Sequence, residues 1–161
     1  MKARLVPLLF VLLLSFVFAL LEVQIEGDQG WASGLPTWRI EGTLLNRVLF
    51  DGRPFTGYHV YVLLFIALVF HLPFVLGLAW TVKAEARGIG LMMLFWIMED
   101  FLWFMVNPAF GLSGFNPEQA WWHRDTWLGF APRGYFAGIV IAVPLYFWGS
   151  TSRSSRDPRS G

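Results

Sequence analysis

The sequence contains no cysteine and few charged residues. Cysteine is absent from all 161 positions, which excludes disulfides, thiol redox chemistry and thiolate metal sites. Lys, Arg, Asp and Glu make up 14% of the chain, against about 25% in soluble domains. The net charge is +1, so the chain lacks the basic footprint of a nucleic-acid binder. These absences argue against a soluble enzyme, a disordered chain and nucleic acid as a partner.

The hydrophobic residues of the chain are concentrated in four long runs. Hydrophobic residues make up 56% of the chain, and a bilayer core about 30 Å thick needs about 20 of them in a helix. The pattern predicts an all-α integral membrane protein, a four-transmembrane-helix bundle that contacts membrane lipids. It forms a single domain over residues 1–149, with spans over about residues 5–22, 58–82, 89–106 and 134–149.

The first run has an alternative interpretation. Lys2 and Arg4 precede its apolar residues, and a basic start before an apolar stretch is also the pattern of a secretory signal peptide. Cleavage after Val17-Phe18-Ala19 would remove residues 1–19 and leave three spans. The run is slightly longer than a usual signal-peptide core, which favours a membrane span.

Basic residues around the runs predict an orientation. Lys and Arg are enriched in short cytoplasmic segments, and with four spans they are denser on the side of the termini. That side carries Lys2, Arg4, Lys83, Arg87, Arg153, Arg156 and Arg159. We therefore expect both termini to be cytoplasmic, in the inner membrane of a prokaryotic cell. The polar tail, residues 150–161, has nothing to bury and is expected to be disordered.

Both loops on the predicted outer side are long and contain tryptophan. In the first, residues 41–50 space their apolar side chains as a short amphipathic helix. In the second, Asn116-Pro117-Glu118 is typical of a helix start, and three Trp follow within seven residues. We expect two short interfacial helices, with most of the Trp side chains as anchors in the headgroup region. Long loops are often functional, so the outer face is the expected working face.

The most informative feature is an adjacent pair of acids, Glu99 and Asp100, inside the third run. An Asp at the centre of a membrane helix costs roughly 2.5–3.5 kcal/mol on insertion scales, so something must offset both acids. Helical spacing places Trp96, Trp103 and Asn107 on the same edge of the helix. That edge is expected to face the bundle interior or a wet cavity. The predicted substrate contacts are Trp96, Trp103, Asn107, Trp122 and Asp125.

Histidines are the expected partners of the acids. His71 lies near the middle of the second run, and His123 reaches the acids only if its loop folds down into the bundle. Three interpretations remain open. Glu99, Asp100, His71 and His123 bind a divalent metal ion, or they perform metal-free catalysis in which one carboxyl donates a proton while another accepts one. In the third interpretation the acids pair structurally with His71, Arg124, Arg133 or a partner subunit.

The leading functional hypothesis is an enzyme that performs acid–base or metal-assisted chemistry on a lipid-like apolar substrate. The alternative is a non-catalytic accessory or assembly subunit of a membrane complex, and a third is a proton or ion pathway formed by oligomers. Gly134, Gly138 and Ala142 recur every four residues on the last run. Such a ridge lets another helix approach closely, either within the bundle, in a homo-oligomer or in a membrane-protein partner.

Overall fold

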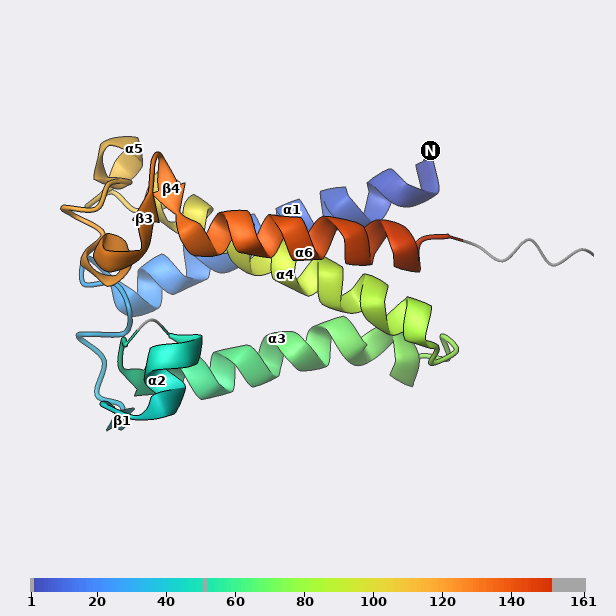
Figure 1. The fold of residues 1–161 in the computed structure, drawn as a ribbon, viewed down its shortest axis with the longest axis horizontal. Coiled ribbons are helices and arrows are strands. Elements are labelled where there is room, and N and C mark those ends of the chain that lie inside the picture. Colours follow the sequence, from blue (N-terminus) through green and yellow to red (C-terminus); the bar gives the residue numbers. More distant parts are fainter. Residues whose placement is uncertain (1, 51, 152–161) are drawn as a thin grey trace, which may run out of the picture.

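Four long helices run along the long axis of the molecule (Figure 1). The structure is a computed structural model that describes residues 2–50 and 52–151, so residues 152–161 of the predicted disordered tail lie outside the described residues. The long helices are α1 (Lys2–Glu26), α3 (Gly57–Val75), α4 (Val82–Val106) and α6 (Arg133–Gly149). The first three contain stretches long and apolar enough to cross a membrane. The mostly helical, membrane-compatible class is thereby confirmed.

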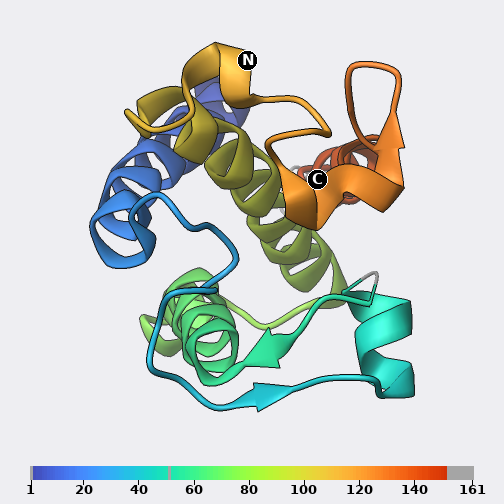
Figure 2. The same cartoon turned by 90° about the vertical axis from the view of Figure 1, so that its left-hand side faces the viewer.

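Helix α4 is the centre of the bundle. It packs along α1 on one side and along α6 on the other, whereas α3 packs on it much less (Figure 2). The Ser15 hydroxyl of α1 donates a hydrogen bond to the Phe95 carbonyl of α4, 3.1 Å away in the buried interface. Phe18, Ile66 and Phe95 form a buried cluster that joins α1, α3 and α4. Every other long helix is therefore positioned through α4.

The α4–α6 contact depends on small residues. Gly90 of α4 lies so close to α6 that a Cβ atom there would be 2.8 Å from the Ala142 carbonyl oxygen. Gly138 faces the Ile97 side chain of α4 in the same interface, whereas Gly134 has no neighbouring atom within 4 Å. Gly138 and Ala142, predicted as part of a packing ridge, therefore lie against α4 inside the bundle.

The turn between α3 and α4 differs from the sequence-based expectation. The predicted second span ran to residue 82 and the third began at 89, but α3 ends at Val75 and α4 begins at Val82. Gly77, with φ +102°, ends α3, because Leu78 N–H and Gly77 N–H donate back to the Pro73 and Phe74 carbonyls. Thr81 then caps α4 by accepting from Ala84 N–H. Apolarity could not locate this turn, because its residues are themselves apolar.

The two long connections lie together at the end of the bundle opposite the α3–α4 turn, the first residues of α1 and the last residues of α6, which is called the termini side (Figure 1). In the first, Asn46 donates from Nδ2 to the carbonyls of Ile40 (2.8 Å) and Arg53 (2.9 Å). The first connection contains β1 (Arg39–Ile40), α2 (Leu44–Leu49) and β2 (Phe55–Thr56), with β1 and β2 paired antiparallel. The second contains α5 (Gly111–Gly114), the 3-10 helix η1 (Trp121–Thr126) and the antiparallel pair β3 (Trp127–Leu128) and β4 (Ala131–Pro132).

The α-helix expected to begin at Asn116 is not formed. Asn116 Oδ1 accepts from Glu118 N–H (2.9 Å) and Gln119 N–H (3.0 Å), and the segment makes a turn before η1. Asx turns and helix N-caps use the same local hydrogen bonds, which explains why the sequence signal did not separate them. The placement of α2 and η1 at a membrane interface stays a prediction.

We expect Gly90→Ala to destabilise the bundle, because its Cβ would force the α4 and α6 backbones apart. Overpacking of this kind costs about 1–3 kcal/mol, which corresponds to a drop of about 2–12 °C in the melting midpoint of a chain of this size. Thermal unfolding of the detergent-solubilised chain, followed by Trp fluorescence, measures it. Gly134→Ala is the matched control, because open space surrounds that position. Equal midpoints for the two variants would contradict the close contact.

Candidate functional site

A cavity of about 230 Å³ lies at the loop end of the bundle, among residues of α1, α3, α4, η1 and the first long connection. We call it the acid cavity, because four carboxyls line it together with one guanidinium and two imidazoles. Its ionisable residues are Glu22, Glu26, Glu99, Asp100, Arg53, His59 and His123, and its aromatic wall consists of Trp31, Phe50, Trp96, Trp103 and Trp122.

Glu99 is the most buried carboxyl of the cavity. The residue is 3% exposed, and its side chain is in hydrogen-bonding contact with the Glu22 side chain of α1. Glu22 Oε1 also accepts from the Tyr58 hydroxyl of α3 at 2.7 Å. Two ionised carboxylates are both acceptors only, so the Glu22–Glu99 contact becomes a hydrogen bond when one of them carries a proton. The geometry therefore suits a proton shared between α1 and α4.

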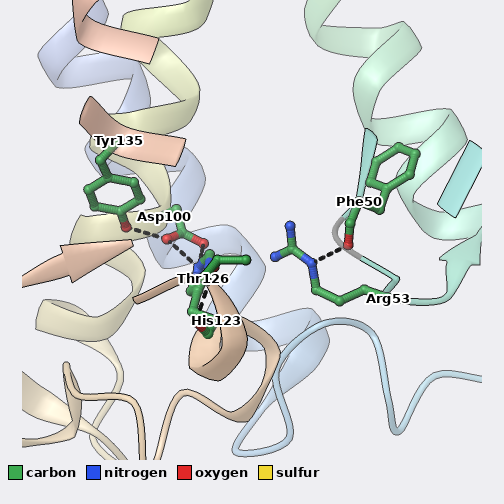
Figure 3. A network of polar contacts seen from close by, with 6 residues as sticks. All are labelled: Phe50, Arg53, Asp100, His123, Thr126 and Tyr135. Atoms are coloured by element: carbon green, nitrogen blue, oxygen red, sulfur yellow. Dashed lines mark hydrogen bonds and ion pairs between the residues drawn. The ribbon is translucent and has the colours of Figure 1, made fainter. Parts of the chain in front are cut away.

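Asp100 has a different set of partners. Its Oδ2 accepts from His123 Nε2 at 3.0 Å and from the Tyr135 hydroxyl of α6 (Figure 3). The Thr126 hydroxyl donates to the His123 carbonyl at 3.1 Å, which closes η1 on itself. An ionised carboxylate can only accept, so two donors on one oxygen are the arrangement that suits an ionised Asp100. Adjacent residues of α4 thus serve two unlike networks.

Arg53 approaches the Asp100–His123 pair from the first connection. Figure 3 shows its guanidinium directed toward that pair, while its Nε donates to the Phe50 carbonyl at 2.7 Å. The guanidinium lies over the Trp31 ring, 3.9 Å from the ring centroid, a cation–π contact. Arg53 thereby brings a positive charge to a wall that is otherwise rich in acid.

The backbone beside this contact is strained. Trp31 and Ala32 have φ values of +49° and +51°, a region that costs a non-glycine residue about 1–3 kcal/mol. The strain is held in place because the Glu26 carboxylate accepts from Ala32 N–H. Trp31 also packs on the His59 ring, with centroids 4.3 Å apart. Strain that the surroundings maintain in this way is typical of functional sites.

The structure brings six of the predicted site residues to the acid cavity. The carboxyls Glu99 and Asp100 and the imidazole of His123 line it, together with Trp96, Trp103 and Trp122. Trp103 Nε1 and Glu99 Oε1 are buried without a hydrogen-bond partner among the described residues. A buried donor and a buried acceptor in the same cavity are groups that a substrate or water would satisfy.

His71 is not brought to this site. Its Nε2 lies 3.0 Å from Glu85 Oε1, and its Nδ1 lies 2.7 Å from the Ala67 carbonyl. Glu85 precedes Glu99 by fourteen residues of α4, about 21 Å of helix. The expectation that His71 joins the acids is corrected for a simple reason. Antiparallel neighbours meet at equal distances from their turn, which pairs His71 with Glu85 and brings Glu99 to the level of Tyr58.

Two other predicted contacts have structural or surface positions. Asn107 is 2% exposed, donates to the Gly27 carbonyl at 2.8 Å and accepts from Ala109 N–H, so it ties the end of α4 to the end of α1. Asp125 is exposed on η1 and does not line the acid cavity. Trp122 is not a headgroup anchor, because it is 5% exposed and packs against Trp103 and Phe104.

A metal centre finds no support in the geometry of these side chains. Among residues 2–50 and 52–151, no three His, Asp or Glu side chains are grouped so that they could hold a metal ion. Of the predicted ligands, His71 is remote, Glu99 contacts Glu22, and Asp100 is shared by His123 and Tyr135. The residues present do not fit the predicted divalent ion.

Sequence reasoning missed several cavity residues that lie outside the acid pair. Glu22 and Glu26 are one helical turn apart and continue the buried face of α1 marked by Val11, Ser15 and Ala19. The sequence could have indicated this, because residues three or four positions apart share a helix face. Glu22 and Glu26 continue the spacing of the buried residues and are therefore expected on the same face. The positions of Arg53, Tyr58 and Tyr135 depend on how the connections fold, and no sequence spacing indicates them.

Comparison of the chain with protein-family models, curated proteins and solved structures finds no match. The function is therefore argued from the chemistry of the acid cavity.

We expect Tyr135→Phe to destabilise the folded chain, because it removes a hydroxyl donor from a carboxylate. A hydrogen bond to a charged group contributes about 1.5–3 kcal/mol. Thermal unfolding in detergent measures the change. Tyr61→Phe is the matched control, since Tyr61 is 67% exposed and should retain the wild-type midpoint. A Tyr135→Phe midpoint equal to that of the control would show that the Asp100 contact contributes nothing.

Proposed function

We propose that this chain is a membrane-embedded enzyme that performs acid–base chemistry on a lipid-like apolar substrate at the acid cavity. One observation carries the proposal. Glu99 is buried in contact with a second carboxyl, Glu22, while the adjacent Asp100 is held by His123 and Tyr135. Paired carboxyls in unlike environments divide the roles of proton donor and proton acceptor.

The roles follow from the partners of each group. Glu99, sharing a proton with Glu22, is the donor, and its Oε1 faces no competing donor among the described residues. Asp100 with His123 forms the accepting side, because that carboxylate is already oriented by two donors. Glu26 lies one turn beyond Glu22, toward the loop end. A proton that Glu99 gives to substrate is then replaced from the aqueous side through Glu22.

We further propose that α6 is a fourth span and that both termini are cytoplasmic. Helix α6 has 17 residues, about 26 Å of helix, and lies along α4 for its full length (Figure 1). Its outward residues, among them Ile139, Val140, Ile141 and Phe147, are exposed and apolar. With this orientation the acid cavity lies in the outer half of the bilayer, where an apolar substrate would reach it sideways.

An accessory-subunit role is the second candidate, and one observation favours it. Helix α3 packs little against its neighbours and exposes large side chains, among them Tyr61, Leu64, Phe65 and Leu68. A partner helix would cover such a face as well as lipid does. A proton pathway has less support, because the buried cluster of Phe18, Ile66 and Phe95 lies between the acid cavity and the opposite end.

We expect Glu99→Gln and Asp100→Asn to abolish turnover while leaving the chain folded. Both substitutions preserve side-chain shape and remove a group that exchanges protons, and general acid–base catalysis contributes about 10²–10⁴-fold in rate. Mass spectra of lipids from membranes with wild-type chain, each variant and no chain would reveal a lipid that only the wild type changes.

The matched control is Glu85→Gln, which removes an acid from the same helix outside the acid cavity and should retain activity. His71→Gln should behave like this control and His123→Gln like the acid variants. Loss of abundance or of the folded state in both acid variants would instead establish a structural role. A lipid profile unchanged by the wild-type chain would contradict the enzyme proposal.

A further inference from the structure

A second, larger cavity lies at the opposite end of the bundle from the acid cavity. Its volume is about 830 Å³, and residues of α1, α3, α4 and the α3–α4 turn form its walls, with Gly149 and Thr151 also at its edge. We call it the termini-side cavity. The cluster of Phe18, Ile66 and Phe95 lies between the two cavities along each of the three helices. The termini-side cavity is therefore a separate site.

The walls of this cavity are apolar over most of their area. The lining includes Phe10 and Leu14 of α1, Val69 and Phe70 of α3, and Leu91 of α4. The volume falls within the roughly 300–1,000 Å³ range of ligand sites. An occupant of these walls is expected to be a hydrocarbon chain, because a small polar molecule would leave the apolar surface unfilled.

The outer edge of the cavity is positively charged. Lys83 and Arg87, one turn apart near the start of α4, line it, and none of its described lining residues is acidic. The nearest acid on the helix, Glu85, lies against His71 outside the cavity lining. Lys83 Nζ donates to Thr151 Oγ1 at 2.7 Å. The charge at this edge is therefore not neutralised by any carboxylate that lines the cavity.

Arg87 adds a second observation that points to an anionic ligand. Its guanidinium lies 5.8 Å from the Tyr146 ring centroid, and its Nε is buried without a hydrogen-bond acceptor among the described residues. A buried guanidinium N–H without an acceptor is costly, and Arg is suited to bidentate binding of phosphate oxygens. A phosphate at this edge would accept from Arg87 and contact the Lys83 ammonium.

We propose that the termini-side cavity binds an anionic phospholipid, with an acyl chain between α1, α3 and α4 and the phosphate at Lys83 and Arg87. Basic pockets between membrane helices on the cytoplasmic side are sites for anionic headgroups. The positive charge at the edge favours an anionic headgroup over a neutral one, and the apolar walls favour a lipid over a free anion. The site is independent of the acid cavity, so it holds whether or not the chain is an enzyme.

Thermal unfolding of the purified full chain in mild detergent tests the proposal. Phosphatidylglycerol, phosphatidylcholine with the same acyl chains, and inorganic phosphate are added separately. A ligand that binds the folded state raises the melting midpoint, so phosphatidylglycerol should raise it clearly more than phosphatidylcholine, and phosphate alone should not. Equal shifts from the two lipids would overturn the headgroup contact, and the same shift from inorganic phosphate would overturn the acyl-chain contact.

Variants locate the effect. Arg87→Gln and Lys83→Gln should each lose most of the phosphatidylglycerol shift. Gly88→Leu should lose it too without changing the charge, because Gly88 lines the cavity and a Cβ there would have no atom closer than 4.0 Å. Arg47→Gln, an exposed arginine of α2 at the loop end, is the matched control and should keep the full shift. If Arg87→Gln does not fold, the phosphatidylglycerol shifts of Lys83→Gln and Gly88→Leu still test the proposal. A full shift in both would overturn the proposal.

Discussion

The position of two carboxyls inside the apolar helix α4 is the constraint on which the loop end of this molecule depends. Glu99 and Asp100 lie within a helix apolar enough to cross a membrane, and an acid in that environment must be protonated, paired or hydrogen-bonded. The structure supplies partners from three other elements, because Glu22 comes from α1, His123 from η1 and Tyr135 from α6. Tyr58 of α3 donates in turn to Glu22. Of these partners only His123 lies in a long connection, and the fold of that connection brings it to Asp100.

The central place of α4 lets one helix carry two unlike sites. Its C-terminal half presents acids to the loop end, and its first turns present Lys83 and Arg87 to the opposite end. Between them the helix buries Phe95 against α1 and α3 and places Gly90 against α6. The polar groups are thus separated by a tightly packed middle. In the proposed orientation, the acid cavity belongs to the outer leaflet and the basic edge to the cytoplasmic one.

The hydrophobic pattern predicted the helices better than their ends. The apolar runs correspond to α1, α3, α4 and α6. Such runs are easy to recognise because a helix that crosses a bilayer needs about 20 predominantly apolar residues in succession. The turn at residues 76–81 was misplaced by several residues, since Gly77 and Thr81 are local signals inside an apolar stretch. Asn116 was interpreted as a helix start, although its side chain closes a turn. Local hydrogen-bonding signals of this kind have more than one structural outcome.

The sequence by itself determined the membrane-compatible helical class and the location of the unusual acids, because an acid within an apolar run is visible without any partner. Tertiary structure decided which groups meet those acids. Because α3 and α4 pack antiparallel, His71 contacts Glu85, and the fold of the second connection places His123 of η1 against Asp100. Glu22 became part of the site because α1 packs its buried face along α4. These contacts depend on how the helices are aligned along one another and on how the loops fold. Both are properties of the folded chain, and no residue spacing in the sequence indicates them.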